Sequence, residues 1–281
     1  MLNASAPAGA SRLPRHASRG LALLAILALY GLARLPEPSA ETRAALAAPF
    51  RFVQQPLGDT PGPHRTQRDV SPALAGIAAW ISSVGAAVAL ADFDGDGLAN
   101  DACLVDPRSD RVTVLPVPGS GARYAVAVLD ARPLAFDATM APMGCLPGDF
   151  DEDGRTDALV YYWGRTPVIF VGDGHGGFRP VELAAQPARW FSNSATAADL
   201  DGDGHPDLVV ANYFPDGAHI LDAASPAPEA MQHSMSRAYN GGPAHFFLAA
   251  GGRPGAPRFV ETRVELPADV RGGWTLALGA A

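Results

Sequence analysis

The sequence has 281 residues, including 30 glycines and 26 prolines, and its formal net charge is −8 at pH 7. So many turn-forming residues exclude a protein built on long helices, and the acidic balance excludes the basic surface that nucleic acid requires. All 21 basic residues are arginine, which also excludes catalytic lysines and lysine-dependent phosphate loops.

Residues 1–34 have the pattern of a signal peptide or a signal anchor. Arg12, Arg15 and Arg19 precede an apolar run over residues 21–33, and no acidic residue lies before it. This run is shorter than the about 20 residues of a membrane span. We therefore expect export to the periplasm, the cell surface or the medium, either with cleavage or with an N-terminal membrane anchor. The many prolines of residues 35–75 predict a linker.

Residues 76–281 carry three copies of one acidic motif, D-x-D-x-D-G-x-x-D, two of them full matches and the first a near match. The copies begin at Asp92, Asp149 and Asp199, so they recur about every 50 residues, as in repeat architectures such as propellers. Short apolar, β-prone runs precede and follow each copy, which predicts a strand–loop–strand unit. An EF-hand is excluded because none of the copies has glutamate at position 12.

The carboxylate spacing favours Ca²⁺, a hard cation with a flexible shell of oxygen ligands. Aspartates at positions 1, 3, 5 and 9 offer carboxylates, glycine at position 6 allows a sharp turn, and position 7 offers a backbone carbonyl. In the first copy position 9 is Asn100, and the adjacent Asp101 is the alternative ligand. Without a cation such close carboxylates repel one another strongly. The predicted ligands of three Ca²⁺ sites are Asp92, Asp94, Asp96, Leu98, Asn100 and Asp101; Asp149, Asp151, Asp153, Arg155 and Asp157; and Asp199, Asp201, Asp203, His205 and Asp207.

The chain contains two cysteines, Cys103 and Cys145, which lie in apolar segments beside the first and second copies of the motif. In an exported chain an even number of cysteines suggests a disulfide. Two buried free thiols are the alternative, and the sequence leaves both open.

The strand–loop–strand units resemble FG-GAP/VCBS repeats, the blades of integrin-α-type β-propellers. The glycine-rich turn 172–177 before Phe178 is similar to a turn of that family, and segment 234–242 is similar to exported bacterial proteins of the cartilage-acidic-protein (ASPIC/UnbV) type. The resemblance covers residues 76–281 and implies an all-β fold, an incomplete β-propeller of about three to four blades. A fourth motif would begin just after residue 281, so we expect the sequence to be truncated within a longer repeat protein.

The resemblance implies an exported calcium-binding scaffold for protein or glycan interaction or adhesion, without catalytic activity. The alternative is a calcium-dependent propeller enzyme that acts on polysaccharide or another extracellular substrate. Tyr161, Tyr162 and His175 are the acid–base candidates for that alternative, but the sequence contains neither G-x-S-x-G nor H-E-x-x-H. A surface-layer component without a specific partner is a third option. No nucleic acid partner is expected, and membrane contact is expected only through an N-terminal anchor.

Overall fold

The computed structural model describes residues 15–34, 37–50, 52–57, 60, 62–229, 231, 238, 240–267 and 272–279. Some features predicted from the sequence lie outside the described residues: Arg12 of the signal segment, most of segment 234–242, and the last two residues. The chain divides into two units, Met1–Gln55 and Pro56–Ala281.

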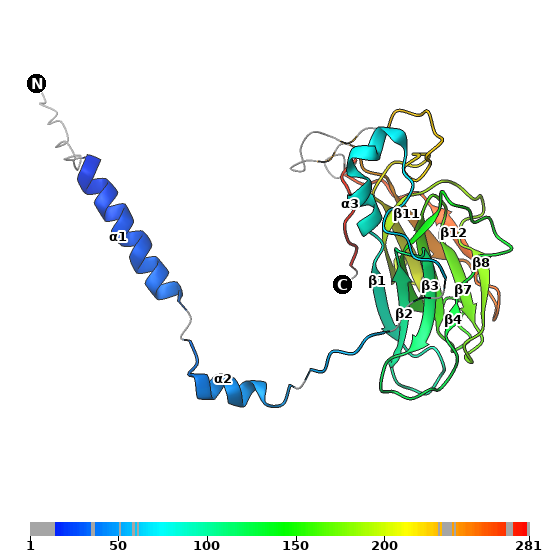
Figure 1. Ribbon diagram of the computed structural model, residues 1–281, viewed down its shortest axis with the longest axis horizontal. Coiled ribbons are helices and arrows are strands. Elements are labelled where there is room, and N and C mark those ends of the chain that lie inside the picture. Colours follow the sequence, from blue (N-terminus) through cyan, green and yellow to red (C-terminus); the bar gives the residue numbers. More distant parts are fainter. Residues whose placement is uncertain are drawn as a thin grey trace, which may run out of the picture. The chain divides into compact units, whose positions relative to one another are not determined.

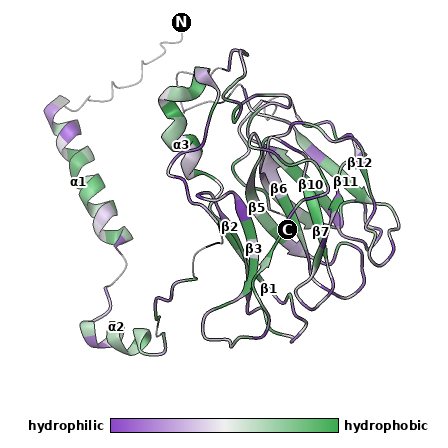
Figure 2. Ribbon diagram, turned by 45° about the vertical axis from the view of Figure 1, so that its right-hand side comes forward, coloured by the Kyte–Doolittle hydropathy of each residue, from purple (hydrophilic) through white to green (hydrophobic). Residues whose placement is uncertain are grey.

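The first unit contains two helices, α1 (Arg15–Ala33) and α2 (Ala40–Ala47). Hydrophobic residues line α1 (Figure 2), and large apolar side chains such as Leu24 and Leu32 are exposed. Ser39 caps α2, because its hydroxyl oxygen accepts the N–H of Thr42 at 3.1 Å. Among the residues that the structure describes, no helix has both the length and the apolar character needed to cross a bilayer. The signal peptide or anchor stays a prediction.

The second unit begins with irregular chain, followed by a short 3-10 helix, η1 (Pro72–Ile77), and α3 (Ala78–Ser83). Its strands form three four-stranded antiparallel sheets, each made of strands consecutive in the chain (Figure 1). Sheet A contains β1 (Ala87–Ala91), β2 (Asp101–Asp106), β3 (Arg111–Pro116) and β4 (Ala127–Val128). Sheet B contains β5 (Ala141–Gly148), β6 (Asp157–Trp163), β7 (Val168–Gly172) and β8 (Phe178–Glu182). Sheet C contains β9 (Ser192–Ala198), β10 (Asp207–Asn212), β11 (Ala244–Ala249) and β12 (Phe259–Thr262).

This arrangement confirms that the fold is mostly β and that each acidic motif joins two strands. The motifs connect β1 to β2, β5 to β6 and β9 to β10, and each of these strand pairs is antiparallel. Each motif therefore occupies the same place in its sheet, between the first strand and the second.

Sheet B lies between the other two sheets, and its strands supply side chains to two separate cores. In β6, Ala158 and Val160 pack against sheet A, whereas Leu159 packs against sheet C. Successive side chains of a strand point to opposite faces, so a strand covered on both faces has a continuous apolar sequence. The sheet A side chains in the first core include Cys103, Val105, Val112 and Val114, and Phe93 of the acidic motif between β1 and β2 packs with them. The sheet C partners in the second include Leu208, Val210 and Phe247.

The chain before the first strand packs on the sheets, whereas the sequence predicts a linker as far as residue 75. The buried guanidinium of Arg68 donates to the carbonyl of Ile81 at 2.9 Å and pairs with Asp110 at 2.8 Å. Leu74 lies in a third core that includes Trp163. A buried, fully paired arginine ties its segment to the body, because leaving such a charge unpaired is costly. The division between the two units accordingly falls between residues 55 and 56.

A disulfide joins Cys103 of β2 to Cys145 of β5, with the two Cα atoms 6.4 Å apart. Both cysteines lie in the core shared by sheets A and B. Of the two alternatives that the sequence leaves open, the structure shows the disulfide, and this bond links two neighbouring sheets covalently.

Candidate metal centres

The three acidic motifs form loops that we call loop 1 (residues 92–100), loop 2 (149–156) and loop 3 (199–206). Each loop is followed by an aspartate that is the first residue of the next strand and is fully buried: Asp101, Asp157 and Asp207. We call these residues the strand-start aspartates.

The first aspartate of each loop closes the turn by accepting hydrogen bonds from the backbone. In loop 2, Asp149 Oδ2 accepts the N–H of Gly154 at 2.8 Å. The matching distances are 2.7 Å from Gly97 to Asp92 and 3.0 Å from Gly204 to Asp199. The chain thus turns around this carboxylate, which in loops 1 and 3 brings the carboxylates at positions 3 and 5 close to it.

Two positions of each loop have a left-handed backbone, whereas the sequence analysis predicted a sharp turn only at position 6. The φ angles at position 6 are 86° for Gly97, 85° for Gly154 and 91° for Gly204. At position 4 they are 77° for Gly95, 57° for Glu152 and 81° for Gly202. Glycine adopts this conformation without steric cost, and Glu152 is the exception among the six. The paired glycines of the D-G-D-G sequences in loops 1 and 3 were the signal that could have revealed this.

The strand-start aspartate fastens each loop to its sheet. In loop 2, Asp157 accepts the N–H of Phe150 at 2.9 Å with one oxygen and the N–H of Gly172, at the end of β7, at 2.9 Å with the other. In loop 3, Asp207 accepts the N–H of Leu200 at 2.8 Å and that of Ala249 in β11 at 2.7 Å.

In loop 1 the residue equivalent to Asp157 is Asp101 rather than Asn100. Asp101 accepts the N–H of Phe93 at 2.7 Å, the same bond that Asp157 makes in loop 2. The side chain of Asn100 instead donates to Asp96 at 3.1 Å. Loop 1 therefore contains one extra residue before its strand-start aspartate, and of the two alternatives left open by the sequence, Asp101 takes the equivalent place.

Loop 2 gathers three carboxylates in a largely buried setting. One oxygen each from Asp149, Asp151 and Asp157 lies within 4.8 Å of the others. Burial raises the pKa of Asp157 to about 7, and the charges of Asp151 and Asp149 act in the same direction. Burial is also the main cause that raises the pKa of Asp151. Keeping these buried carboxylates ionised next to one another therefore costs free energy, and a bound cation would remove that cost.

Asp151 is a buried carboxylate of loop 2 whose hydrogen bonds are incomplete among the residues that the structure describes. Its side chain is 4% exposed, and its Oδ2 accepts the N–H of Gly255 from the β11–β12 turn. Among the described residues, its buried Oδ1 has no hydrogen-bond partner. A buried carboxylate oxygen without a partner is costly unless a cation or water satisfies it. Of the other predicted ligands of this loop, Asp153, whose side chain is buried, pairs at 2.8 Å with the exposed side chain of Arg155.

Loop 3 gathers Asp199, Asp201 and Asp203, with one oxygen each within 4.8 Å, and all three residues are exposed. Partial desolvation, followed by the charges of the neighbouring aspartates, raises the pKa of Asp201. His205 Nδ1 lies 2.6 Å from Glu152 Oε1, so this side chain joins loop 3 to loop 2. The fully buried Asp207 lies outside the group of three.

Loop 1 also gathers three carboxylates, from Asp92, Asp94 and Asp96, but an arginine enters the group. Arg123, from the β3–β4 connection, places Nη1 2.6 Å from Asp94 Oδ2 and 2.8 Å from Asp96 Oδ2. The side chain of Leu98, another predicted participant, is exposed. Arg123 lies 29 residues from Asp94 in the sequence, and no motif spacing pointed to it.

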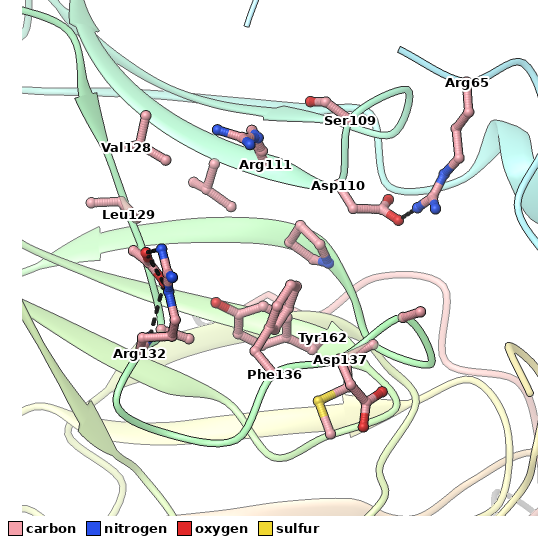
Figure 3. Close-up of a pocket in the computed structure, with 16 residues that line it drawn as sticks. Arg65, Ser109, Asp110, Arg111, Val128, Leu129, Arg132, Phe136, Asp137 and Tyr162 are labelled. Carbon is pink, nitrogen blue, oxygen red and sulfur yellow. Dashed lines mark hydrogen bonds and ion pairs between the residues drawn. The ribbon is translucent and has the colours of Figure 1, made fainter. Parts of the chain in front are cut away.

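A pocket of about 400 Å³ lies at the other end of sheets A and B (Figure 3). It is formed by the β2–β3 turn, the chain after β4 and the end of β6, which lie opposite the acidic loops because the strands are antiparallel. Phe136, 41% exposed, meets Tyr162 edge to face with ring centroids 6.0 Å apart. Two arginines on the rim, Arg65 and Arg132, form ion pairs with neighbouring aspartates.

Comparison with known families identifies part of the second unit. Residues 149–210 match the family described as FG-GAP-like repeat. This span runs from the start of loop 2 through loop 3 into β10, so it contains one full interval between motifs. No curated protein matches the chain. The match confirms the FG-GAP part of the resemblance, and the similarity to cartilage-acidic-protein relatives stays a prediction.

Proposed function

We propose that the second unit is a calcium-stabilised scaffold of the β-propeller type that binds an extracellular protein or glycan and catalyses no reaction. Three consecutive four-stranded sheets, stacked through shared cores, support the assignment of each sheet as one blade. The FG-GAP-like match over residues 149–210 supports the same assignment. The observation that carries the calcium part is the buried, unpartnered Oδ1 of Asp151 within a group of carboxylates.

The residues of loops 2 and 3 fit Ca²⁺ better than other biological cations. All the side-chain donors are carboxylate oxygens, which suit a hard cation, and the groups contain no cysteine or histidine ligand. Of the hard cations, Ca²⁺ accepts a flexible shell, whereas Mg²⁺ requires near-octahedral geometry and keeps its waters. In loop 2 the ion would be held by Asp149, Asp151 and Asp157, and in loop 3 by Asp199, Asp201 and Asp203. The ion supplies positive charge, and the protein's part is to hold the oxygens in place through the backbone bonds described above.

Calcium binding is tested by thermal unfolding of the full chain in 1 mM calcium chloride and in EDTA. Extracellular calcium modules have Kd values near 0.1–1 mM, so a site with a Kd of about 0.1 mM contributes about 1.4 kcal/mol at that concentration. At about 2–4 °C per kcal/mol for a domain of this size, each site raises the Tm by about 4 °C. An unchanged Tm on chelation of a folded sample would contradict the calcium assignment.

The pocket of Figure 3 is our candidate for the binding site, with a glycan as the favoured ligand. The exposed face of Phe136 offers an apolar platform, and the paired arginines and aspartates on the rim offer hydrogen-bond donors and acceptors. Phe136→Ala is expected to abolish binding on a glycan array, whereas Phe52→Ala, at an exposed site in the first unit, leaves it unchanged. A ligand whose binding survives Phe136→Ala binds elsewhere on the scaffold.

Two further observations support an exported, non-catalytic protein. Burial raises the pKa values of Tyr161 and Tyr162, which disfavours the phenolate that a general base requires. The disulfide between Cys103 and Cys145 suits an oxidising compartment, as does the signal-like N-terminal segment. Turnover of a polysaccharide by the purified chain would refute the non-catalytic assignment.

A further inference from the structure

We propose that loop 1 takes no divalent ion, because the guanidinium of Arg123 occupies the loop as a built-in counter-charge. The sequence motif is nearly the same in all three loops, so it predicts a site in each, the weakest in loop 1 unless Asp101 replaces Asn100 as a ligand. This inference concerns loop 1 only, and it holds or fails independently of whether loops 2 and 3 bind calcium.

Arg123 contacts two of the three grouped carboxylates of loop 1 and the strand-start aspartate behind them. Nη1 bridges Asp94 and Asp96, the carboxylates at positions 3 and 5, at 2.6 and 2.8 Å. Nη2 contacts Asp101 Oδ1 and donates to the carbonyl of Asn100 at 3.1 Å. The planar guanidinium carries several donors and a permanent charge, so one side chain satisfies three carboxylates together. An ion entering the same oxygens would have to expel this group.

The extra residue of loop 1 explains why an arginine is needed there. In loops 2 and 3 the second oxygen of the strand-start aspartate accepts a main-chain N–H, from Gly172 or Ala249. Ala158 pairs with Phe170 and Leu208 with Phe247, so each donor lies two residues beyond the partner of the residue that follows the aspartate. In sheet A the residue paired with Asp101 is Pro116, and the next N–H, that of Val117, donates to the Asn100 carbonyl at 2.9 Å.

Asp101 Oδ1 therefore lacks the backbone donor that its two counterparts have. Asp101 is fully buried, and a buried carboxylate oxygen without a hydrogen-bond donor is costly. Arg123 supplies that partner and, with its other nitrogen, neutralises the carboxylates of the loop. The inserted residue thus removes a backbone hydrogen bond to Asp101. The side chain of Arg123 replaces that hydrogen bond and also supplies the positive charge that an ion would otherwise bring.

The test counts calcium ions bound to the full chain by equilibrium dialysis followed by metal analysis. We expect two ions in the wild type and three in Arg123→Gln, because the glutamine leaves the carboxylates of loop 1 without a counter-charge. Arg263→Gln is the control: Arg263 forms an ion pair with Glu265 in which both side chains are exposed, outside the three loops, and its loss leaves the count at two. Three ions in the wild type, or an unchanged count in folded Arg123→Gln, would overturn the proposal.

A second variant, Asp94→Asn, tests the proposal even if Arg123→Gln does not fold. Asp94→Asn in the otherwise wild-type chain removes a carboxylate that Arg123 already neutralises, so the ion count stays at two. Loss of one ion in this variant would show that loop 1 binds calcium and would overturn the proposal.

The inference remains testable even if the wild-type chain binds no calcium, which would refute the calcium assignment of loops 2 and 3 alone. In EDTA, Arg123→Gln is then expected to lower the Tm by about 10 °C, since it leaves a fully buried carboxylate unpaired. Arg263→Gln, which breaks an exposed pair, is expected to leave the Tm within about 2 °C of the wild type. Equal Tm values for the two variants would overturn the role of Arg123.

Discussion

Replacing Asp151 with asparagine tests the proposed metal centre in loop 2, because the variant is expected to lose stability only when calcium is present. The amide oxygen of asparagine still accepts the N–H of Gly255, but one negative charge is gone. Burial, together with the charges of Asp153 and Asp149, raises the pKa of Asp151, so its negative charge destabilises the fold when no ion is bound. In EDTA the variant therefore unfolds at the same temperature as the wild type or at a higher one. In calcium the variant loses one ligand and with it the stabilisation by the ion.

The size of the loss follows from the binding equilibrium. A site with a Kd of about 0.1 mM contributes about 1.4 kcal/mol at 1 mM calcium, so the variant should melt about 4 °C below the wild type in calcium. The assay is thermal unfolding of both proteins in calcium and in EDTA. Asp201→Asn in loop 3 is the matched control for an exposed ligand and should show the same loss in calcium. A loss of equal size in EDTA would refute the reasoning, because it would assign Asp151 a structural role.

Three further predictions concern the loops, the acid–base behaviour and the disulfide. Gly204→Ala costs about 1 kcal/mol in urea unfolding, because φ is +91° there, although a Cβ would meet nothing within 4 Å. Burial lowers the pKa of His245, but hydrogen bonds to Asp216 and Glu261 outweigh it and raise the pKa overall. Protonated His245 therefore contributes stability that is fully present below about pH 6.5 and is lost as the pH rises through the raised pKa. His245→Gln is expected to remove this pH dependence in urea titrations from about pH 5 to 9. Cys103→Ser opens a crosslink between residues 42 apart and lowers the free energy of unfolding by about 4 kcal/mol; an unchanged urea midpoint would contradict it.

The strand–loop–strand units could be predicted from the sequence because they depend on local signals. Apolar runs on both sides of an acidic motif indicate strands, and the motif's spacing indicates the loop. The structure places these loops between the first and second strands of three separate sheets. The packing of the segment before residue 76 could not be predicted from the sequence, because its prolines are typical of a linker. The structure buries Arg68 and Leu74 against residues that are distant in the sequence.

The groups that pair with the loop carboxylates could not be predicted, because they come from distant parts of the chain. Asp151 meets a backbone N–H from Gly255, which is 104 residues away, and Arg123 reaches loop 1 from the β3–β4 connection. Neither contact has a fixed spacing from the motif. The choice between Asn100 and Asp101 likewise depended on which residue begins β2, and strand boundaries are not set by the motif itself.

An acidic loop of this kind specifies a group of carboxylates, and the rest of the fold determines which positive charge neutralises it. In loop 2 the strand-start aspartate has two backbone donors, and one buried oxygen of Asp151 remains without a partner, so a diffusible ion is favoured. In loop 1 one inserted residue diverts a backbone N–H to the Asn100 carbonyl, and a guanidinium takes its place. The first sheet would then keep its loop closed without calcium, while the second and third would depend on calcium. Stability of the repeats would therefore vary along the chain with calcium concentration, although the motif is nearly the same in all three.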